Sequence, residues 1–229
     1  MSFAEWPELA TVSKEQRFEL VVKDAKGRNP SLSDDELQKS VFSKNPQLNF
    51  VSISGCGLSH LSPSITSCSQ LTKLVIIRNE LVSVPDEIGR GMNRYNRKGF
   101  QLTNAGLFDF SALQALLVLD ISHNELTSVP ATLTGGQLVR LHTLNLAHNK
   151  ITEVTPKLNV IEHMKTLNLS ENEITSLPWA IGQMEKIRIL DLSQNPFKDG
   201  RFRKLANDKR AKVSAVVAYI AKHAPRVTE

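Results

Sequence analysis

The residues best suited to chemistry in this sequence are cations near its C-terminus. Residues 196 to 229 contain nine Lys or Arg and three acids, whereas the whole chain has a formal net charge of +5. Clustered cations attract polyanions, because each phosphate contact releases counterions. We therefore expect a polyanion site made of Lys198, Arg201, Arg203, Lys204, Lys209, Arg210 and Lys212. The alternative is a solvated helix face, since only Phe197, Phe202 and Tyr219 offer aromatic support.

Other reactive side chains do not form a catalytic pattern. His123 and His148 are 25 residues apart, and Asp120 is near the first of them. A zinc site needs three or four converging ligands, but Cys56 and Cys68 belong to a much earlier part of the chain. The sequence also has neither a Gly-x-Ser-x-Gly elbow nor a glycine-rich phosphate loop. We expect no metal, no cofactor and no enzymatic activity.

An internal repeat explains the spacing of most of these residues. The pattern is L-x-x-L-x-L-x-x-N-x-L-x-x-L-P, with other aliphatic residues allowed at the Leu positions. It begins at Leu48, Leu71, Leu116, Leu141, Met164 and Ile187, so successive starts are 23, 45, 25, 23 and 23 residues apart. A repeat of this length buries its apolar edge only by stacking on its neighbours. The pattern predicts an α/β fold, a leucine-rich repeat solenoid or horseshoe.

Each repeat is expected to contribute one short strand to a parallel, concave sheet. The strands should centre near 51–53, 74–76, 119–121, 144–146, 167–169 and 190–192. The Asn that follows each strand has a structural explanation, because its amide both donates to and accepts from backbone groups in a sharp turn. These residues are Asn79, Asn124, Asn149, Asn172 and Asn195, and Cys56 takes the position in the first repeat.

The two ends and one interruption depart from the pattern. Residues 1–47 predict a helical N-terminal cap, with one capping box at Ser13 and another at Ser33. Phe18, Val21 and Val22 have helical spacing after the first box. Residues 48–199 hold the repeats, and 200–229 form a basic cap with one helix from about 208 to 223. Residues 90–110 break the pattern; an inserted loop, a degenerate repeat and a gene-model artefact are all open explanations.

The exposed side chains of the concave sheet are the expected site for a protein partner. Solenoids commonly bind with this face. The candidates are Lys73, Ile77, Arg78, Asp120, His123, Asn145, His148, Asn168 and Asp191. Asp or Asn is common at the positions of Asp120, Asn145, Asn168 and Asp191, so those four have an equally simple structural explanation. Lys73, Ile77 and Arg78 depart more from the pattern.

Short segments at both ends carry a narrower resemblance. They are Trp6-Pro7-Glu8-Leu9, Val51 to Gly57, Ile77-Arg78-Asn79, Lys198-Asp199, Arg201 to Lys204 and Tyr219-Ile220. The chain resembles intracellular leucine-rich repeat proteins, and these segments are similar to the N-terminal region of the leucine-rich repeat-containing protein 47 family. In that family the repeats precede a basic linker and a module similar to the B3/B4 part of phenylalanyl-tRNA synthetase. We find no such module in this sequence, so its activity is not carried over.

Composition and charge narrow the remaining function classes. The sequence has no apolar stretch near the roughly 20 residues of a membrane span and no secretory-signal pattern at its start. Two unclustered cysteines favour a reducing compartment. We expect a cytoplasmic monomer, with the nucleus as an alternative, that acts as a protein-binding scaffold. The competing hypothesis is a translation-linked factor whose basic end binds RNA or a ribonucleoprotein.

Overall fold

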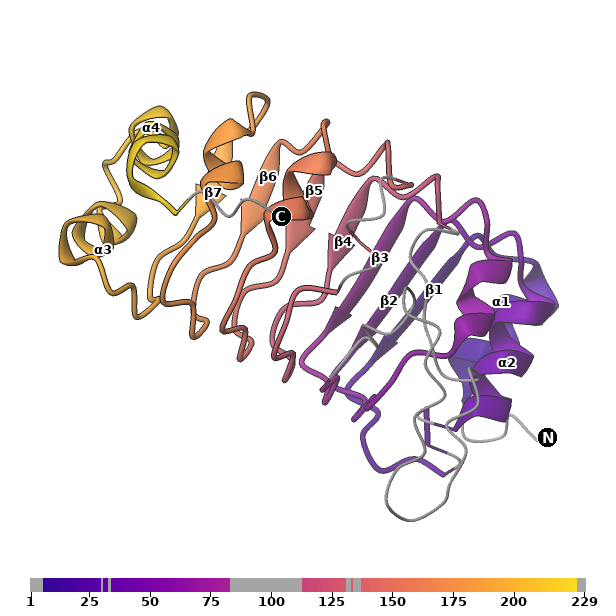
Figure 1. Cartoon of the computed structure of the whole chain (residues 1–229). Coiled ribbons are helices and arrows are strands. Elements are labelled where there is room, and N and C mark those ends of the chain that lie inside the picture. The colour runs from indigo at the N-terminus through magenta and orange to yellow at the C-terminus, as the bar shows by residue number, and fades with distance from the viewer. Residues whose placement is uncertain are drawn as a thin grey trace, which may run out of the picture.

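One parallel sheet runs the length of the molecule. The computed structural model describes residues 6–29, 31–32, 34–82, 113–130, 133 and 137–225. Seven strands lie in sequence order from β1 to β7, and Figure 1 shows them side by side as a curved ribbon. They are β1 (Glu19–Lys23), β2 (Phe50–Ser54), β3 (Lys73–Ile77), β4 (Val118–Asp120), β5 (Thr143–Asn145), β6 (Thr166–Asn168) and β7 (Ile189–Asp191). The six predicted strands and their parallel pairing are confirmed.

The core lies between this sheet and the segments that return behind it. Inward side chains such as Leu74 and Ile76 are fully buried, and so is the Ile65 of one returning segment. Three of these segments lie wholly within the described residues and are 3-10 helices: η1 (Pro63–Ser67), η4 (Pro156–Val160) and η5 (Trp179–Gln183). Parallel strands require such crossovers, and burying each aliphatic side chain contributes roughly 1.5–3 kcal/mol.

The asparagine ladder is confirmed as a chain of backbone hydrogen bonds. The Oδ1 of Asn149 accepts from the Leu126 N–H at 3.0 Å, which belongs to the preceding repeat. Its Nδ2 donates to Ile121 of that repeat and to Leu146 of its own. The equivalent amides of Asn79, Asn124, Asn172 and Asn195 bond in the same way. The amides therefore join neighbouring repeats where the chain leaves the sheet.

The N-terminal cap contains a strand that the helical spacing did not predict. Helix α1 (Pro7–Glu15) ends before Gln16, which adopts left-handed backbone angles, and β1 follows. The helix predicted through Phe18 and Val22 is therefore wrong. The alternation of β1 buries Leu20 and Val22 and extends the sheet by one strand beyond β2. Pairing the backbone of β2 outweighed the local helical pattern.

The second predicted capping site lies one residue later than expected. Helix α2 (Asp35–Lys44) begins after Asp34, whose Oδ1 accepts from the Leu37 N–H at 2.8 Å. Ser13 does not cap a helix but lies inside α1, where its Oγ accepts from the Asn45 amide at 3.0 Å. The cap is thus built from two helices and a strand.

The C-terminal cap contains two helices instead of one. Helix α3 (Gly200–Asn207) precedes α4 (Val213–His223), so the predicted start at 208 is wrong. Asp208 accepts from the Arg210 N–H in the turn that separates them. Helix α4 packs on η5 and buries Val216 and Ile220. The proposed interruption at 90–110 lies outside the described residues.

Candidate binding surfaces

The sheet register assembles the predicted partner-binding residues into rows. Lys73 pairs with Val118, and that row continues through the later strands to Ile189. A second row consists of Val75, Asp120, Asn145, Asn168 and Asp191. The outward side chains of all these strands are exposed or half-buried, whereas the alternating leucines are mostly buried. These two rows place five of the nine predicted residues on one face: Lys73, Asp120, Asn145, Asn168 and Asp191.

Four of these nine residues hold the ends of their own strands. The Asp120 Oδ1 accepts from both the backbone N–H and the hydroxyl of Ser122. Asn168 and Asp191 make the same pair of bonds two residues ahead. Asn145 accepts from the Ala147 N–H and donates to the Asp120 Oδ2 at 3.0 Å. Their presence at this position thus has a structural explanation, and they offer a partner only their remaining polar atoms.

A third row lies just beyond the strands and has unusual backbone geometry. Each of its members precedes a ladder asparagine and has a positive φ between 53° and 59°, a region that is uncommon for side chains other than Gly. The row consists of Arg78, His123, His148, Glu171 and Gln194. Because each residue directly precedes a buried asparagine, the left-handed geometry turns its side chain outward. The row is therefore exposed as a consequence of the ladder.

The two histidines of this row stack on each other. Their rings are 3.9 Å apart with an interplanar angle of 15°, and the His148 Nδ1 lies 2.9 Å from a Glu171 carboxylate oxygen. Partial desolvation lowers the pKa of His123, and repulsion from His148 and Arg78 lowers it further. The stack therefore favours a neutral His123 beside an imidazole that can bind a carboxylate.

Lys73, Ile77 and Arg78 form the N-terminal part of the same face. The Lys73 ammonium lies 5.0 Å from the centre of the Phe50 ring, a cation–π distance. Ile77 is half-buried and Arg78 is exposed. In contrast to the Asp and Asn row, none of these three side chains forms a turn-stabilising hydrogen bond within the described residues. This part of the sheet is apolar and basic.

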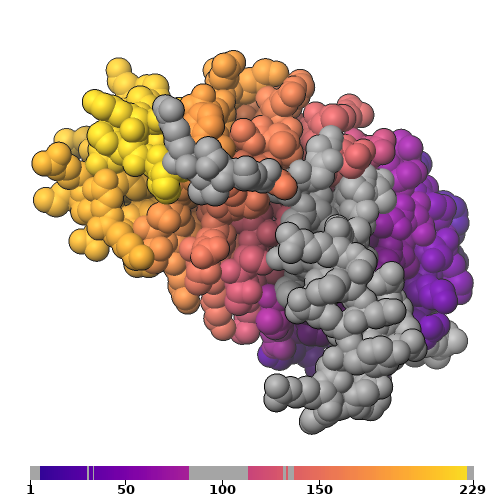
Figure 2. Space-filling model, in the orientation of Figure 1, coloured from indigo at the N-terminus to yellow at the C-terminus, as the bar shows by residue number. Residues whose placement is uncertain are grey.

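The seven predicted polyanion-binding residues are exposed at the other end of the molecule. Figure 2 shows the residues of α3 and α4, in yellow, as the end of the surface opposite the indigo N-terminal cap. None of the seven lies in an ion pair within the described ranges. A neighbouring acid makes local hydrogen bonds: Asp199 caps α3 by accepting from the N–H groups of Arg201 and Phe202. The hydrogen bond from Tyr219 also lowers the pKa of Asp199.

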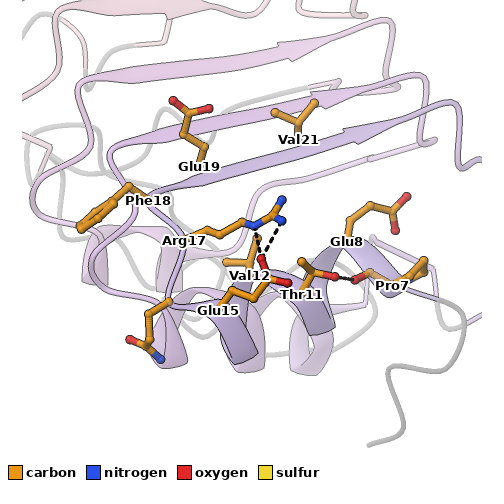
Figure 3. A pocket seen from close by; sticks show the side chains of 10 residues that line it. Pro7, Glu8, Thr11, Val12, Glu15, Arg17, Phe18, Glu19 and Val21 are labelled. Atoms are coloured by element: carbon orange, nitrogen blue, oxygen red, sulfur yellow. Dashed lines mark hydrogen bonds and ion pairs between the residues drawn. The ribbon is translucent and has the colours of Figure 1, made fainter.

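A groove between α1 and β1 was missed in the sequence because the strand itself was missed. It has a volume of about 870 Å³ and is lined by Pro7, Glu8, Thr11, Val12, Glu15, Gln16, Arg17, Phe18, Glu19 and Val21. Figure 3 shows Glu19 and Val21 above α1, with the Arg17 guanidinium directed to Glu15. The exposed apolar side chains of Phe18 and Val21 belong to its lining.

Ser59, His60 and Asp35 bond in series but lack the setting of a hydrolase. The Ser59 hydroxyl lies 3.2 Å from the His60 Nδ1, and the His60 Nε2 lies 3.0 Å from the Asp35 carboxylate. In a catalytic triad the acid is buried, which fixes the imidazole. Here the side chain of Asp35 is 65% exposed. The arrangement is a surface ion pair at the start of α2 and contributes little energy.

The described residues contain neither a metal-binding cluster nor a membrane-spanning helix. No cluster of three or more His, Cys, Asp or Glu side chains capable of holding a metal occurs in those parts of the chain. Within the same ranges, no helix is both long and apolar enough to cross a bilayer.

Comparisons with known proteins agree with the repeat pattern. Residues 139–197 match the leucine-rich repeat family model, and residues 114–159 match a model of two leucine-rich repeats. The chain is 31% identical over 105 residues to an adenylate cyclase of Schizosaccharomyces pombe, covering 44% of this chain and 6% of that protein. It is 34% identical over 135 residues to human podocan-like protein 1, covering 55% and 24%. The matches span less than a quarter of the length of these curated relatives.

Solved structures show the same architecture. An internalin from Listeria monocytogenes superposes with a TM-score of 0.51 at 19% identity, covering 74% of this chain and 42% of that one. A leucine-rich repeat protein of Leptospira interrogans gives a TM-score of 0.51 at 27% identity, covering 74% and 43%. The chain therefore has the fold of a leucine-rich repeat solenoid, and its residues 114–197 carry the sequence of the leucine-rich repeat family.

Proposed function

We propose that the protein is a non-enzymatic binding module whose concave sheet face binds a protein partner. The observation that carries the proposal is the continuous surface made by the in-register rows, from Lys73 to Asp191. Curved solenoids present extended surfaces of this kind to their partners. Because the Asp and Asn row is engaged in turns, the contact is centred on Ile77, Arg78 and the histidine stack. A partner with a carboxylate beside an apolar side chain fits this region.

Site-specific crosslinking tests the location of the contact. A photoreactive amino acid replaces Arg78 on the concave face, or Asn159 on η4 as a matched position behind the core. We expect one defined protein to crosslink at position 78 in cell extract and not at 159. The affinity between this crosslinked protein and the chain should fall at least tenfold when Lys73 and Arg78 are both changed to Glu. Equal adducts at both positions, or an unchanged affinity, would refute the concave-face proposal.

The second candidate function is polyanion binding by the C-terminal cap, with RNA in a ribonucleoprotein as the preferred ligand. It rests on seven exposed cations that have no ion-pair partner in the described chain, while Asp199 is engaged in capping α3. The resemblance to the protein 47 family supports a link to translation by analogy. On this proposal the protein acts in the cytoplasm or nucleus.

A salt titration with labelled single-stranded poly-uridine tests this second function. The logarithm of affinity should fall with the logarithm of salt by about 0.7 per phosphate contact. Changing four cap cations to Glu should abolish binding, whereas a control with four equivalent changes elsewhere should retain it. The first set is Arg201, Arg203, Lys204 and Lys209; the control set is Lys157, Lys165, Lys186 and Arg188. An equal loss of RNA binding in both variants would mean that net charge, and not the C-terminal cap, determines the binding.

A further inference from the structure

We propose that the open edge of β1, beside α1, binds an extended basic peptide of a partner protein as an added strand. This site is the N-terminal edge of the sheet, where Glu19 and Val21 continue the rows of Lys73 and Val75, and it lies at the opposite end of the molecule from the basic cap. It combines three observations: an unpaired strand edge, exposed apolar side chains, and a groove with an excess of carboxylates. Addition of a strand to an exposed edge is a common mode of peptide recognition.

The hydrogen bonds of β1 identify which backbone groups are available. The Phe18 carbonyl accepts from the N–H groups of Asn49 and Phe50 at 2.8 and 3.2 Å, and the Asp24 N–H donates to the Ser54 carbonyl at 2.8 Å. Alternate residues of a strand bond to the same neighbour, so the even-numbered residues face β2. Glu19, Val21 and Lys23 therefore direct their N–H and C=O groups to the open side. No other backbone hydrogen bond reaches these three residues from the described chain.

Two large apolar side chains are exposed along this edge. Phe18 is 60% exposed and Val21 is 40% exposed, and both line the groove. Edge strands that must not pair are usually protected by charges, proline or a bulge. Here only the first and last residues of β1, Glu19 and Lys23, are charged. An added strand would cover the central Val21 with an apolar side chain at the facing position.

The charge of the groove selects a basic partner. Its lining contains Glu8, Glu15 and Glu19 against one cation, Arg17. Arg17 pairs with Glu15, and Arg28 from outside the lining pairs with Glu8, so Glu19 is the acid that has no ion pair within the described residues. A Lys or Arg side chain opposite Glu19 meets this carboxylate directly.

Helix α1 limits the occupant to a single strand. It forms the outer wall of the groove and lies alongside β1 (Figure 3). Five residues of added strand extend about 17 Å, the same length as β1. A second copy of this chain that paired through its own β1 would also bring its own α1 to the same edge. A peptide segment therefore fits the groove better than a second sheet.

A designed peptide pair tests the proposal with the full chain. The probe is a fluorescent heptapeptide of alternating Lys and Val, and the controls are the matched Glu and Val peptide and an N-methylated form of the probe. We expect saturable binding of the probe, at least tenfold weaker binding of the Glu peptide, and at least tenfold weaker binding after N-methylation. N-methylation removes the strand donors without altering the protein. Equal binding of the methylated probe would overturn the proposal.

Two variants locate the site. Val21→Pro removes the central outward N–H but none of the bonds to β2, and proline is tolerated on an edge strand whose N–H faces outward. We expect it to weaken probe binding at least tenfold, and Val21→Ile to leave it within twofold. Glu19→Lys should also weaken binding. Unchanged binding by Val21→Pro and Glu19→Lys, or conversion of the protein to a dimer that excludes the probe, would refute the peptide site.

Discussion

Replacing Asn172 by Ala should remove the rung that joins the fourth and fifth repeats. The Asn172 Oδ1 accepts from the Ile151 N–H at 3.0 Å, and its Nδ2 lies 3.0–3.1 Å from three carbonyl oxygens. Those carbonyls keep another donor each: Asn149 bonds Leu146, Asn195 bonds Leu169, and a backbone N–H bonds Ser170. The Ile151 N–H, in contrast, is left without an acceptor. The main cost is therefore one buried, unpaired donor.

The size of the effect follows from that accounting. An unpaired buried donor costs about 1–3 kcal/mol, and the weakened bonds to the carbonyls add about 1 kcal/mol. We expect a loss of about 3 kcal/mol, which corresponds to a fall in Tm of roughly 6–12 °C for a chain of this size. Urea denaturation and a thermal melt measure it.

A matched surface change provides the control. Asn159 is exposed on η4, so Asn159→Ala should change stability by less than about 0.5 kcal/mol. If Asn172→Ala costs less than about 1 kcal/mol, the ladder does not hold the repeats together as the hydrogen bonds indicate.

Three further predictions concern the histidine stack, the thiols and the C-terminal cap. The pKa of His123 lies below that of a free histidine, so the unfolded chain takes up more protons and stability should decrease as the pH falls below about 6.5. His148→Gln should raise this pKa in an NMR titration; an unchanged value would exclude repulsion from His148. Burial raises the pKa of the Cys68 thiol to about 11, so only about a thousandth is thiolate at pH 8, and Ellman's reagent should react with it only after unfolding. A Cβ on Gly182 would lie 2.5 Å from a backbone nitrogen of α4, whereas one on Gly200 would meet nothing within 4 Å. Gly182→Ala should cost about 1–3 kcal/mol in a thermal melt and Gly200→Ala should cost nothing; equal effects would contradict this packing.

Sequence periodicity was sufficient for the architecture because the repeat imposes the same local geometry six times. The inward leucines, the parallel strands and the asparagine ladder all follow from residues at fixed spacing. The stack of His123 on His148 was also predictable, since both residues occupy the same position in consecutive repeats. In each case the interacting groups are one repeat apart, so spacing along the chain determines distance in space.

What the tertiary structure decided lies mainly at the two ends, where no repeat constrains the chain. Val21 and Val22 have helical spacing, but the open edge of β2 drew them into a strand and thereby created the groove beside α1. Asp208 separates two helices where one was expected. The role of Asp120 in its turn is evident only from the hydrogen bonds that it accepts from Ser122 in the structure. These features depend on which backbone groups remain unpaired after the solenoid has stacked, and local sequence does not encode that.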